Sequence, residues 1–280
     1  ITNGGQLYWF AEQLNSGAVP QNSAAVLTAD IDLEGNWDGS AAGYEGITKD
    51  RNFPGIGTTE RPYQGTFSGG GHTVSAMFIS RWNIKANDIG MFGSVSGASI
   101  SQMTVNGQIN LSAAADKDIQ HVGGIVGSAN GSRLSGLVSD VGILGNGADI
   151  PHIGGVVGEA LNGSTVTRCM YFHYIQMQKT VDCVGGVVGY INNSAVSYCA
   201  NHGTVTTEAA DGYVGGVLGY LNNSAGSVKN CYNYGTVKNG GGNYCGAIVG
   251  WLRSHTAANF TDNYYLTGSA PAAFGSGSGS

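Results

Sequence analysis

The chain has little charge. Twelve basic and eighteen acidic residues make up 11% of its 280 residues, whereas ordinary soluble domains carry about 25% charged residues. Surface helices need a charged face, so this composition disfavours a fold built from amphipathic helices. The basic residues are dispersed along a chain of net charge −6, which leaves no positive surface for phosphate backbones. We therefore expect no nucleic-acid partner.

Other absences exclude further classes of protein. Only five prolines occur and glycine follows no three-residue period, which excludes collagen. No apolar run approaches the roughly 18 residues needed to cross a bilayer, so we expect no membrane insertion. Nucleophile-elbow, P-loop, HExxH and dinucleotide-binding motifs do not occur in their proper contexts. Five cysteines without a CxxC pair predict no disulfide framework and no metal site, and no cofactor is implied.

Glycine, by contrast, is abundant, at 48 of 280 residues. Each glycine inside a helix would cost about 0.5–1 kcal/mol relative to alanine. Hydrophobic residues still make up 41% of the chain, which is enough for a folded core. The composition therefore predicts a β-rich chain that is dense in turns.

Six segments of the chain align with one another. They are Ile89-Gly-Met-Phe-Gly93, Val122-Gly-Gly-Ile-Val-Gly127, Ile153-Gly-Gly-Val-Val-Gly158, Val184-Gly-Gly-Val-Val-Gly189, Val214-Gly-Gly-Val-Leu-Gly219 and Cys245-Gly-Ala-Ile-Val-Gly250. Their first glycines are separated by 33, 31, 31, 30 and 31 residues. A period near 31 with β-branched residues and no helical stripe predicts that each repeat is one coil of a β-solenoid.

A second signature follows within the repeat. It occurs as Ser197-Tyr-Cys-Ala-Asn-His-Gly-Thr-Val205, as Lys229-Asn-Cys-Tyr-Asn-Tyr-Gly-Thr-Val237 and, in degenerate form, as Thr167-Arg-Cys-Met-Tyr171. Together, the two signatures predict three short strands in each coil. We predict an all-β, right-handed parallel β-solenoid of about eight coils, in which like residues stack in ladders about 4.7–4.9 Å apart.

The N-terminal residues predict a capping helix. Asn3 with Gln6 is a helix-start signature. Apolar residues then recur at helical spacing, at Leu7, Phe10, Ala11 and Leu14. Such a helix would cover the open edge of the first coil, and we expect residues 264–266 together with Phe274 to seal the last coil.

These repeats resemble those of bacterial surface proteins with GLUG-type repeats, found beside M26-type immunoglobulin A peptidases and in gut-bacterial cell-wall proteins. The resemblance lies in the Val-Gly-Gly-Val-Val-Gly cores, in Asn230-Cys-Tyr-Asn-Tyr-Gly-Thr-Val237 and in an upstream block that includes Tyr63-Gln-Gly-Thr-Phe-Ser-Gly-Gly-Gly-His-Thr-Val74. It covers nearly the whole chain and implies a solenoid displayed on or secreted from a bacterial cell. Such repeats serve as spacers and binding stalks as well as scaffolds, so the resemblance implies no one activity.

The pattern divides the chain into four parts. Residues 1–20 are the predicted cap, 21–88 the first coils with a loop insertion at 38–53, 89–268 the six repeats, and 269–280 a Gly/Ser-rich tail or linker. We expect the chain to be part of a longer multidomain protein.

Equivalent positions of successive repeats carry cysteines and histidines. We expect Cys169, Cys199 and Cys231 to stack in a buried ladder. His121 and His152 precede successive Gly-Gly strands and should be neighbours on one edge. We interpret them as a ladder of surface histidines, because the sequence shows no third ligand for a metal.

An aromatic column is the first candidate binding site. The residue after each Val-Val-Gly core becomes aromatic in the last three repeats, at Tyr190, Tyr220 and Trp251. Facing solvent, these rings would form a platform on which sugars could stack; facing inward, they would be core. We add Arg253 as a hydrogen-bond donor beside this column, and Tyr171 and His173 from the bulky third repeat.

Acidic residues supply the other candidates. Parallel β-helices can bring carboxylates from neighbouring coils together, as glycoside hydrolysis requires. In that alternative Asp30, Asp32 and Glu159 would be the catalytic acids. The insertion at 38–53 concentrates charge in a charge-poor chain and predicts a polar rim formed by Asp38, Glu45, Asp50 and Arg51.

The function that we expect is non-catalytic. We predict an extracellular bacterial adhesion or ligand-binding module that recognises a glycan or another component of a host surface or extracellular matrix, without a cofactor. The first alternative is a β-helical carbohydrate-active enzyme, either a glycoside hydrolase or a lyase. The second is a passive spacer within a longer surface protein.

Overall fold

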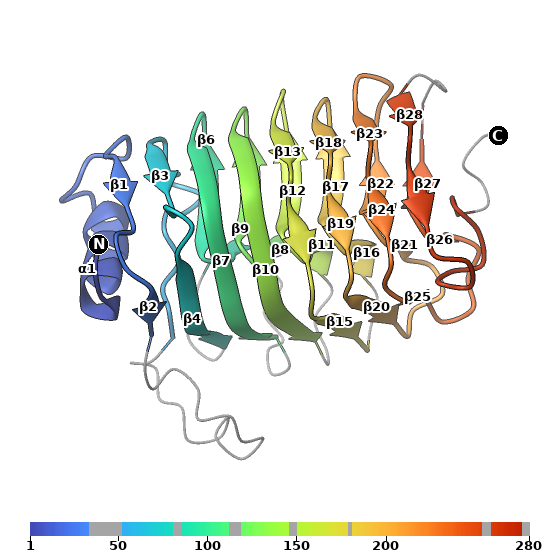
Figure 1. The fold of residues 1–280 in the computed structure, drawn as a ribbon, viewed down its shortest axis with the longest axis horizontal. Helices are drawn as coiled ribbons and strands as arrows, with labels where there is room; N and C mark the ends of the chain where they lie inside the picture. The colour runs from blue at the N-terminus through green and yellow to red at the C-terminus, as the bar shows by residue number, and fades with distance from the viewer. Residues whose placement is uncertain are drawn as a thin grey trace, which may run out of the picture.

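The chain folds as a parallel β-solenoid with one helix at its N-terminal end (Figure 1). The structure, a computed structural model, describes residues 1–33, 52–80, 86–111, 119–145, 150–178, 181–253 and 259–275. Its strands pair in parallel and form three sheets, one of 17 strands and two of six. The predicted fold class is therefore confirmed.

The two six-stranded sheets hold the glycine-rich motifs. The first narrow sheet contains β5 (Asp88–Ile89), β8 (His121–Gly123), β11 (Ile150–Gly154), β16 (Val181–Gly185), β21 (Tyr213–Gly215) and β26 (Cys245–Gly246). The second narrow sheet contains β6 (Phe92–Ser96), β9 (Val126–Asn130), β12 (Val157–Leu161), β17 (Val188–Asn192), β22 (Leu218–Leu221) and β27 (Val249–Leu252).

The 17-stranded sheet, here the wide sheet, runs along the whole solenoid. Its strands are β1 (Ala25–Val26), β2 (Ile31–Asp32), β3 (Thr66–Ser68), β4 (Thr73–Ser80), β7 (Ser99–Asn110), β10 (Arg133–Gly145), β13 (Thr165–Thr167), β14 (Met170–Tyr171), β15 (Tyr174–Met177), β18 (Ala195–Ser197), β19 (Ala200–Asn201), β20 (Thr204–Thr207), β23 (Ser227–Lys229), β24 (Tyr232–Asn233), β25 (Val237–Lys238), β28 (Phe260–Thr261) and β29 (Tyr264–Tyr265).

The number of coils differs from the prediction. Six turns contribute a strand to each of the three sheets, so the expected count of about eight was wrong. Among the described residues before β5, strands β1 to β4 all belong to the wide sheet. These residues form incomplete coils that meet the second narrow sheet through isolated bridges, Ile56 with Phe92 and Tyr63 with Val95.

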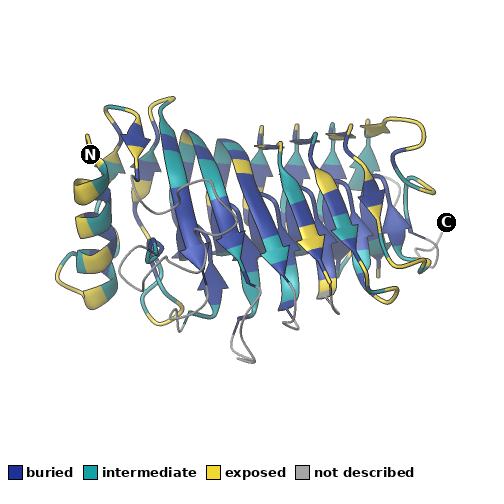
Figure 2. Ribbon diagram, turned by 90° about the horizontal axis from the view of Figure 1, so that it is seen from below, coloured by how far each residue is buried: buried dark blue, intermediate teal, exposed yellow. Residues whose placement is uncertain are grey.

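The repeats stack in register. Gly154 pairs with Gly185, Gly185 with Gly215, and Gly215 with Gly246. The core lies between the sheets and consists of ladders of aliphatic side chains, such as Val157, Val188, Leu218 and Val249, all of which are buried. Figure 2 shows buried residues, in dark blue, along the strands over the length of the solenoid.

The helix α1 (Gly4–Ser16) caps the first coil as predicted. The Asn3 side chain accepts a hydrogen bond from the Gln6 N–H, and Gly17 ends the helix with a φ of 88°. Its buried residues are Leu7, Phe10, Ala11 and Leu14. Among the described residues, no helix has both the length and the apolar character that a membrane crossing needs.

The C-terminal end departs in part from the prediction. Tyr264, Tyr265 and Leu266 are exposed, so they do not seal the last coil. Phe274 does contribute to the seal, since it bridges to Val249 and packs edge-on against Phe260. Tyr264 continues the outward row of the wide sheet from Tyr232, whereas Tyr265 is in register with the buried Asn233 but is exposed in the last coil.

All five cysteines are buried and free. Cys169, Cys199 and Cys231 form the predicted ladder, in which the Cys169 N–H donates to Cys199 Sγ and the Cys199 N–H to Cys231 Sγ, each at 3.4 Å. Burial holds the pKa of the Cys183 and Cys199 thiols well above its usual value.

We expect the native chain to resist thiol reagents. Titration with a maleimide at neutral pH should label none of the five thiols within minutes, because reaction requires an accessible thiolate. The same titration in denaturant should label all five. Rapid labelling of the native chain would contradict the burial of the ladder.

Candidate functional site

The glycine motif forces a sharp corner between the two narrow sheets. A Cβ on Gly154 would overlap the carbonyl oxygen of Val157, and one on Gly158 would lie 2.6 Å from the carbonyl oxygen of Gly127. Only glycine lets backbone approach backbone this closely. The chain therefore folds back on itself within six residues, and the side chains on either side of the motif meet outside the core.

Two ladders of side chains face each other across this corner, and we call them together the corner strip. Residues two before the first glycine form one ladder: Asp88, His121, His152, Cys183, Tyr213 and Tyr244. Residues that follow the last glycine form the other: Ser94, Ser128, Glu159, Tyr190, Tyr220 and Trp251. The predicted column of Tyr190, Tyr220 and Trp251 is thus present as a ladder.

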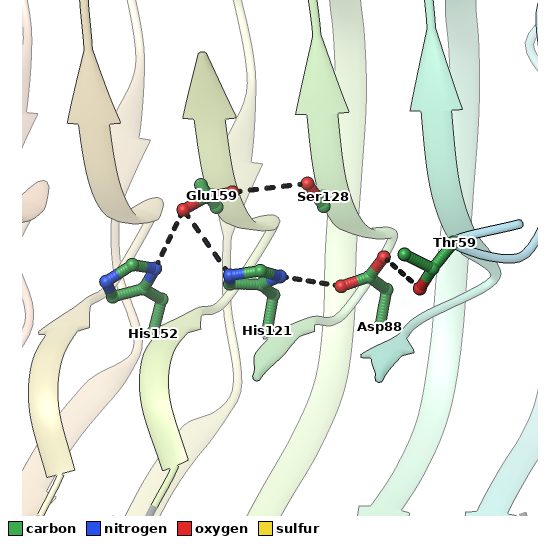
Figure 3. Close-up of polar contacts among 6 residues, drawn as sticks. All are labelled: Thr59, Asp88, His121, Ser128, His152 and Glu159. Carbon is green, nitrogen blue, oxygen red and sulfur yellow. Dashed lines mark hydrogen bonds and ion pairs between the residues drawn. The ribbon is translucent and has the colours of Figure 1, made fainter. Parts of the chain in front are cut away.

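The N-terminal half of the corner strip is a polar network (Figure 3). His121 lies between two carboxylates: its Nδ1 is 2.6 Å from Asp88 Oδ1, and its Nε2 is 3.4 Å from Glu159 Oε2. His152 Nδ1 is 3.1 Å from the same Oε2. Hydroxyl groups orient both carboxylates, since Thr59 donates to Asp88 Oδ2 at 3.1 Å and Ser128 donates to Glu159 Oε1 at 3.3 Å.

This network is largely shielded from water, which sets its charge state. Burial by itself would lower the pKa of His121, but its contacts with Asp88 and Glu159 outweigh burial and raise that pKa to about 9. Burial would likewise raise the pKa of Glu159, but the two histidines outweigh it and lower that pKa to about 2. Near neutral pH, His121 is therefore an imidazolium held between two carboxylates.

The C-terminal half of the corner strip is aromatic, and its rings stack on one another. Tyr220 and Trp251 stack with centroids 5.2 Å apart, and Tyr213 covers Trp251 at 4.7 Å. Tyr190 stacks on His152 at 4.2 Å, which joins the two halves. Tyr220 is only 9% exposed. The faces of these rings are used within the strip, so a sugar could reach mainly their edges.

The remaining predicted binding residues lie apart from one another. Arg253 is exposed beside the column and donates to Asn222 Oδ1 at 3.2 Å. His173 is half-buried against the edge of Tyr174. Tyr171 was wrongly placed among the ligand contacts, because it is fully buried and donates to the Val141 carbonyl at 3.1 Å. Its ring fills the space over Gly155 and Gly203, where the two following coils carry a smaller asparagine.

The predicted acids do not converge. Asp30 is exposed on the first coil, where the Thr73 N–H and then His72 lower its pKa, and the exposed Asp32 lies on β2 nearby. Glu159 has Ser128, His121 and His152 as its partners. The acid that does approach Glu159 is Asp88, which the sequence analysis missed. The imidazole of His121 fills the space between the two, where a glycosidase would need room for a sugar and water.

The predicted loop rim cannot be placed. Asp38, Glu45, Asp50 and Arg51 all lie outside the described residues.

A second aromatic surface lies on the outer face of the wide sheet, and sequence analysis missed it. We call it the aromatic patch: Phe172, His202, Tyr232, Tyr234 and Tyr264. Tyr234 is 59% exposed and Tyr264 68% exposed. Phe172 stacks on His202 with centroids 4.9 Å apart, and His202 Nε2 is 2.8 Å from the Tyr232 hydroxyl. Apart from the half-buried His202, these rings are exposed to solvent, unlike those of the corner strip.

A buried row of polar side chains holds the aromatic patch in place. The Asn201 Nδ2 donates to Asn233 Oδ1 at 2.7 Å and to the Gly203 carbonyl at 3.0 Å. Its Oδ1 accepts from the Gly203 N–H at 3.0 Å. Strand alternation points the asparagines inward and the residues beside them outward. The Cys-x-Asn-x-Gly-Thr signature is thus a rigid base that presents two outward side chains in each coil.

Signals for the missed residues were present in the sequence. Asp88, Tyr213 and Tyr244 stand two positions before the first glycine of their motifs, as His121 and His152 do. Phe172, His202 and Tyr234 stand one position after the inward residue of the second signature. The period therefore identifies each ladder, although the inward or outward direction of a ladder does not follow from the period.

The comparisons with known proteins support the fold. No family model and no curated protein matches the chain. A solved structure from Bacteroides ovatus, described as a "putative immunoglobulin A1 protease", is similar with a TM-score of 0.61 and 18% sequence identity, covering 95% of this chain and 83% of that one. Identity this low shows a shared fold and carries no activity across. Membership of the GLUG-type repeat family therefore stays a prediction, and the chain is established as a β-solenoid similar to that protein.

Proposed function

We propose that this chain is a non-catalytic module that binds a glycan through the aromatic patch and is displayed outside a bacterial cell. The observation that carries the proposal is the row of rings over three successive coils, from the exposed Phe172 through the half-buried His202 to the exposed Tyr234. Large exposed apolar patches of this kind mark binding surfaces.

The chemistry of the patch suits a sugar chain. The apolar face of a sugar ring can lie on an aromatic ring, while the Tyr232 and Tyr234 hydroxyls and His202 offer hydrogen bonds to sugar hydroxyls. Coils follow one another about 4.8 Å apart, which is close to the length of one sugar residue, so an extended glycan can meet successive coils. The chain carries a net charge of −6, which favours neutral over acidic glycans.

Rigidity adds to the affinity of such a surface. The asparagine row beneath the patch fixes the backbone before a ligand arrives, so binding orders few groups. The corner strip is less suited to this role because its ring faces are already covered.

A glycan-array screen with matched variants tests the proposal. We expect the parent chain to bind neutral glycans and the Tyr234→Ser/Tyr264→Ser double variant to bind at least about tenfold more weakly for each ring removed. Trp9→Ser is the control, because Trp9 is 58% exposed on α1, far along the chain from the patch. Trp251→Ala tests the corner strip in the same assay.

Three results would overturn the proposal. One is a folded parent that binds no glycan, and another is a double variant that binds as well as Trp9→Ser. The third is binding to a glycoprotein that persists after enzymatic removal of its glycans, which would assign the patch to a protein partner. Circular dichroism checks the fold of every variant.

A further inference from the structure

The polar half of the corner strip brings together three groups that ligate transition metals. His121, His152 and Glu159 each offer one donor atom, and these atoms all lie within 4.8 Å of one another. The sequence shows no third ligand beside the two histidines and so predicts no metal. The corner between the narrow sheets supplies it, since Glu159 stands opposite the two histidines.

Two of the three distances between the donor atoms fit a tetrahedral ion, and the two histidine nitrogens lie within 4.8 Å of each other. Zinc bonds of about 2.0–2.2 Å at tetrahedral angles place neighbouring donor atoms about 3.3–3.6 Å apart. Glu159 Oε2 lies 3.4 Å from His121 Nε2 and 3.1 Å from His152 Nδ1. Three protein ligands would leave a fourth position for water, and both histidine side chains retain partial exposure, at 19% and 16%.

Two further features point to a ligand. His152 Nδ1 is buried and makes no hydrogen bond, although Glu159 Oε2 lies within 3.1 Å. Two facing atoms this close, an imidazole nitrogen and a carboxylate oxygen, are both able to ligate one cation. Asp88 accepts from His121 Nδ1, so a metal ion that displaces the proton from Nε2 of the imidazolium would meet the lone pair of Nε2 at the site, as in carboxylate–histidine–zinc arrangements.

The surroundings hold the ligands in place before an ion binds. The His152 ring is stacked between Tyr190, at 4.2 Å, and His121, at 5.2 Å. The Ser128 hydroxyl fixes the second oxygen of Glu159. The three ligands come from β8, β11 and β12, so one ion would join two successive coils.

We propose that His121, His152 and Glu159 form a binding site for a divalent transition-metal ion, zinc or its near relatives, with Asp88 positioning His121. Two imidazoles favour zinc, cobalt, nickel or copper over magnesium and calcium, which prefer oxygen ligands. This inference is independent of the glycan-binding proposal.

Equilibrium dialysis of the tag-free chain against zinc chloride, with metal analysis, tests the site. We expect one zinc ion for each parent chain and a rise in Tm with zinc but not with magnesium. The variants Glu159→Gln and His152→Asn should lower zinc affinity by at least about 100-fold. His173→Asn is the matched control, because His173 contacts Tyr174 and lies outside the cluster.

Cobalt substitution keeps the test decisive should a variant fail to fold. The parent loaded with cobalt(II) should show visible bands typical of nitrogen and oxygen ligands, without the near-ultraviolet charge transfer of a thiolate. A thiolate band would place the ion on cysteine and overturn the proposal. So would a folded parent without saturable zinc binding, or zinc affinity unchanged in both variants, which would leave the cluster an ion-pair network only.

Discussion

Gly154→Ala is expected to destabilise the chain by at least about 3 kcal/mol, which should lower its Tm by roughly 5–10 °C. The new Cβ would overlap the Val157 carbonyl oxygen and lie 2.9 Å from the Gly189 nitrogen. Both are backbone atoms of paired strands, so neither can move aside without breaking the ladder. Thermal and urea denaturation followed by circular dichroism would measure the loss.

The control for this prediction is Gly5→Ala in α1. An alanine Cβ there meets only Asn3 Oδ1, at 3.4 Å. Helical alanine is preferred over glycine, so the variant should be unchanged or more stable by up to about 1 kcal/mol. Equal stability of Gly154→Ala and the parent would show that the corner is looser than the structure indicates, and would weaken the geometry on which the metal site depends.

Asn201→Ala is the second substitution with a large expected effect, a loss of about 3 kcal/mol. Asn201 is fully buried and makes three hydrogen bonds, two with Gly203 and one with Asn233. Alanine would leave the Gly203 N–H and the Asn233 carbonyl oxygen unpaired away from water, and each unpaired group costs about 1–3 kcal/mol. Urea denaturation would measure this loss.

Asn130→Ala serves as the control because Asn130 is exposed and its side chain accepts one hydrogen bond, from Asn162. It should change stability by no more than about 0.5 kcal/mol. Asn233→Ala should be nearly as harmful as Asn201→Ala, and the double variant should lose less than the two separate losses combined, because the pair shares one hydrogen bond. If the double variant lost as much stability as the two single variants combined, the two asparagines would not be coupled.

The two surfaces of the solenoid have the same structural origin. In the narrow sheets glycine brings the backbone into a corner, and in the wide sheet buried asparagine closes a turn. In both cases the neighbouring positions point away from the core, so their side chains can differ from coil to coil. The corner strip accordingly changes from Asp and His to Tyr and Trp along the axis, and the aromatic patch gathers in the later coils. Variation along a regular scaffold can therefore place a metal site and a ligand surface on one chain.

The sequence by itself determined the parallel solenoid, the helical cap and the membership of each ladder. Coils that pair in register stack equivalent positions, so a period near 31 predicts which side chains are neighbours along the axis. The cysteine ladder, the His121–His152 pair and the Tyr190–Tyr220–Trp251 column follow from that period alone. The number of coils did not, because residues before β5 build only partial turns.

Only the tertiary structure decided which ladders face each other and which face water. A repeat fixes relations along the axis, but the path within one coil depends on backbone contacts at glycines several residues apart. Those contacts place Glu159 opposite His121 and His152 and cover the rings of Trp251 and Tyr220. Strand alternation sends neighbouring residues to opposite faces but does not say which of them faces inward, and the structure buries Tyr171 and leaves its neighbour Phe172 on the surface.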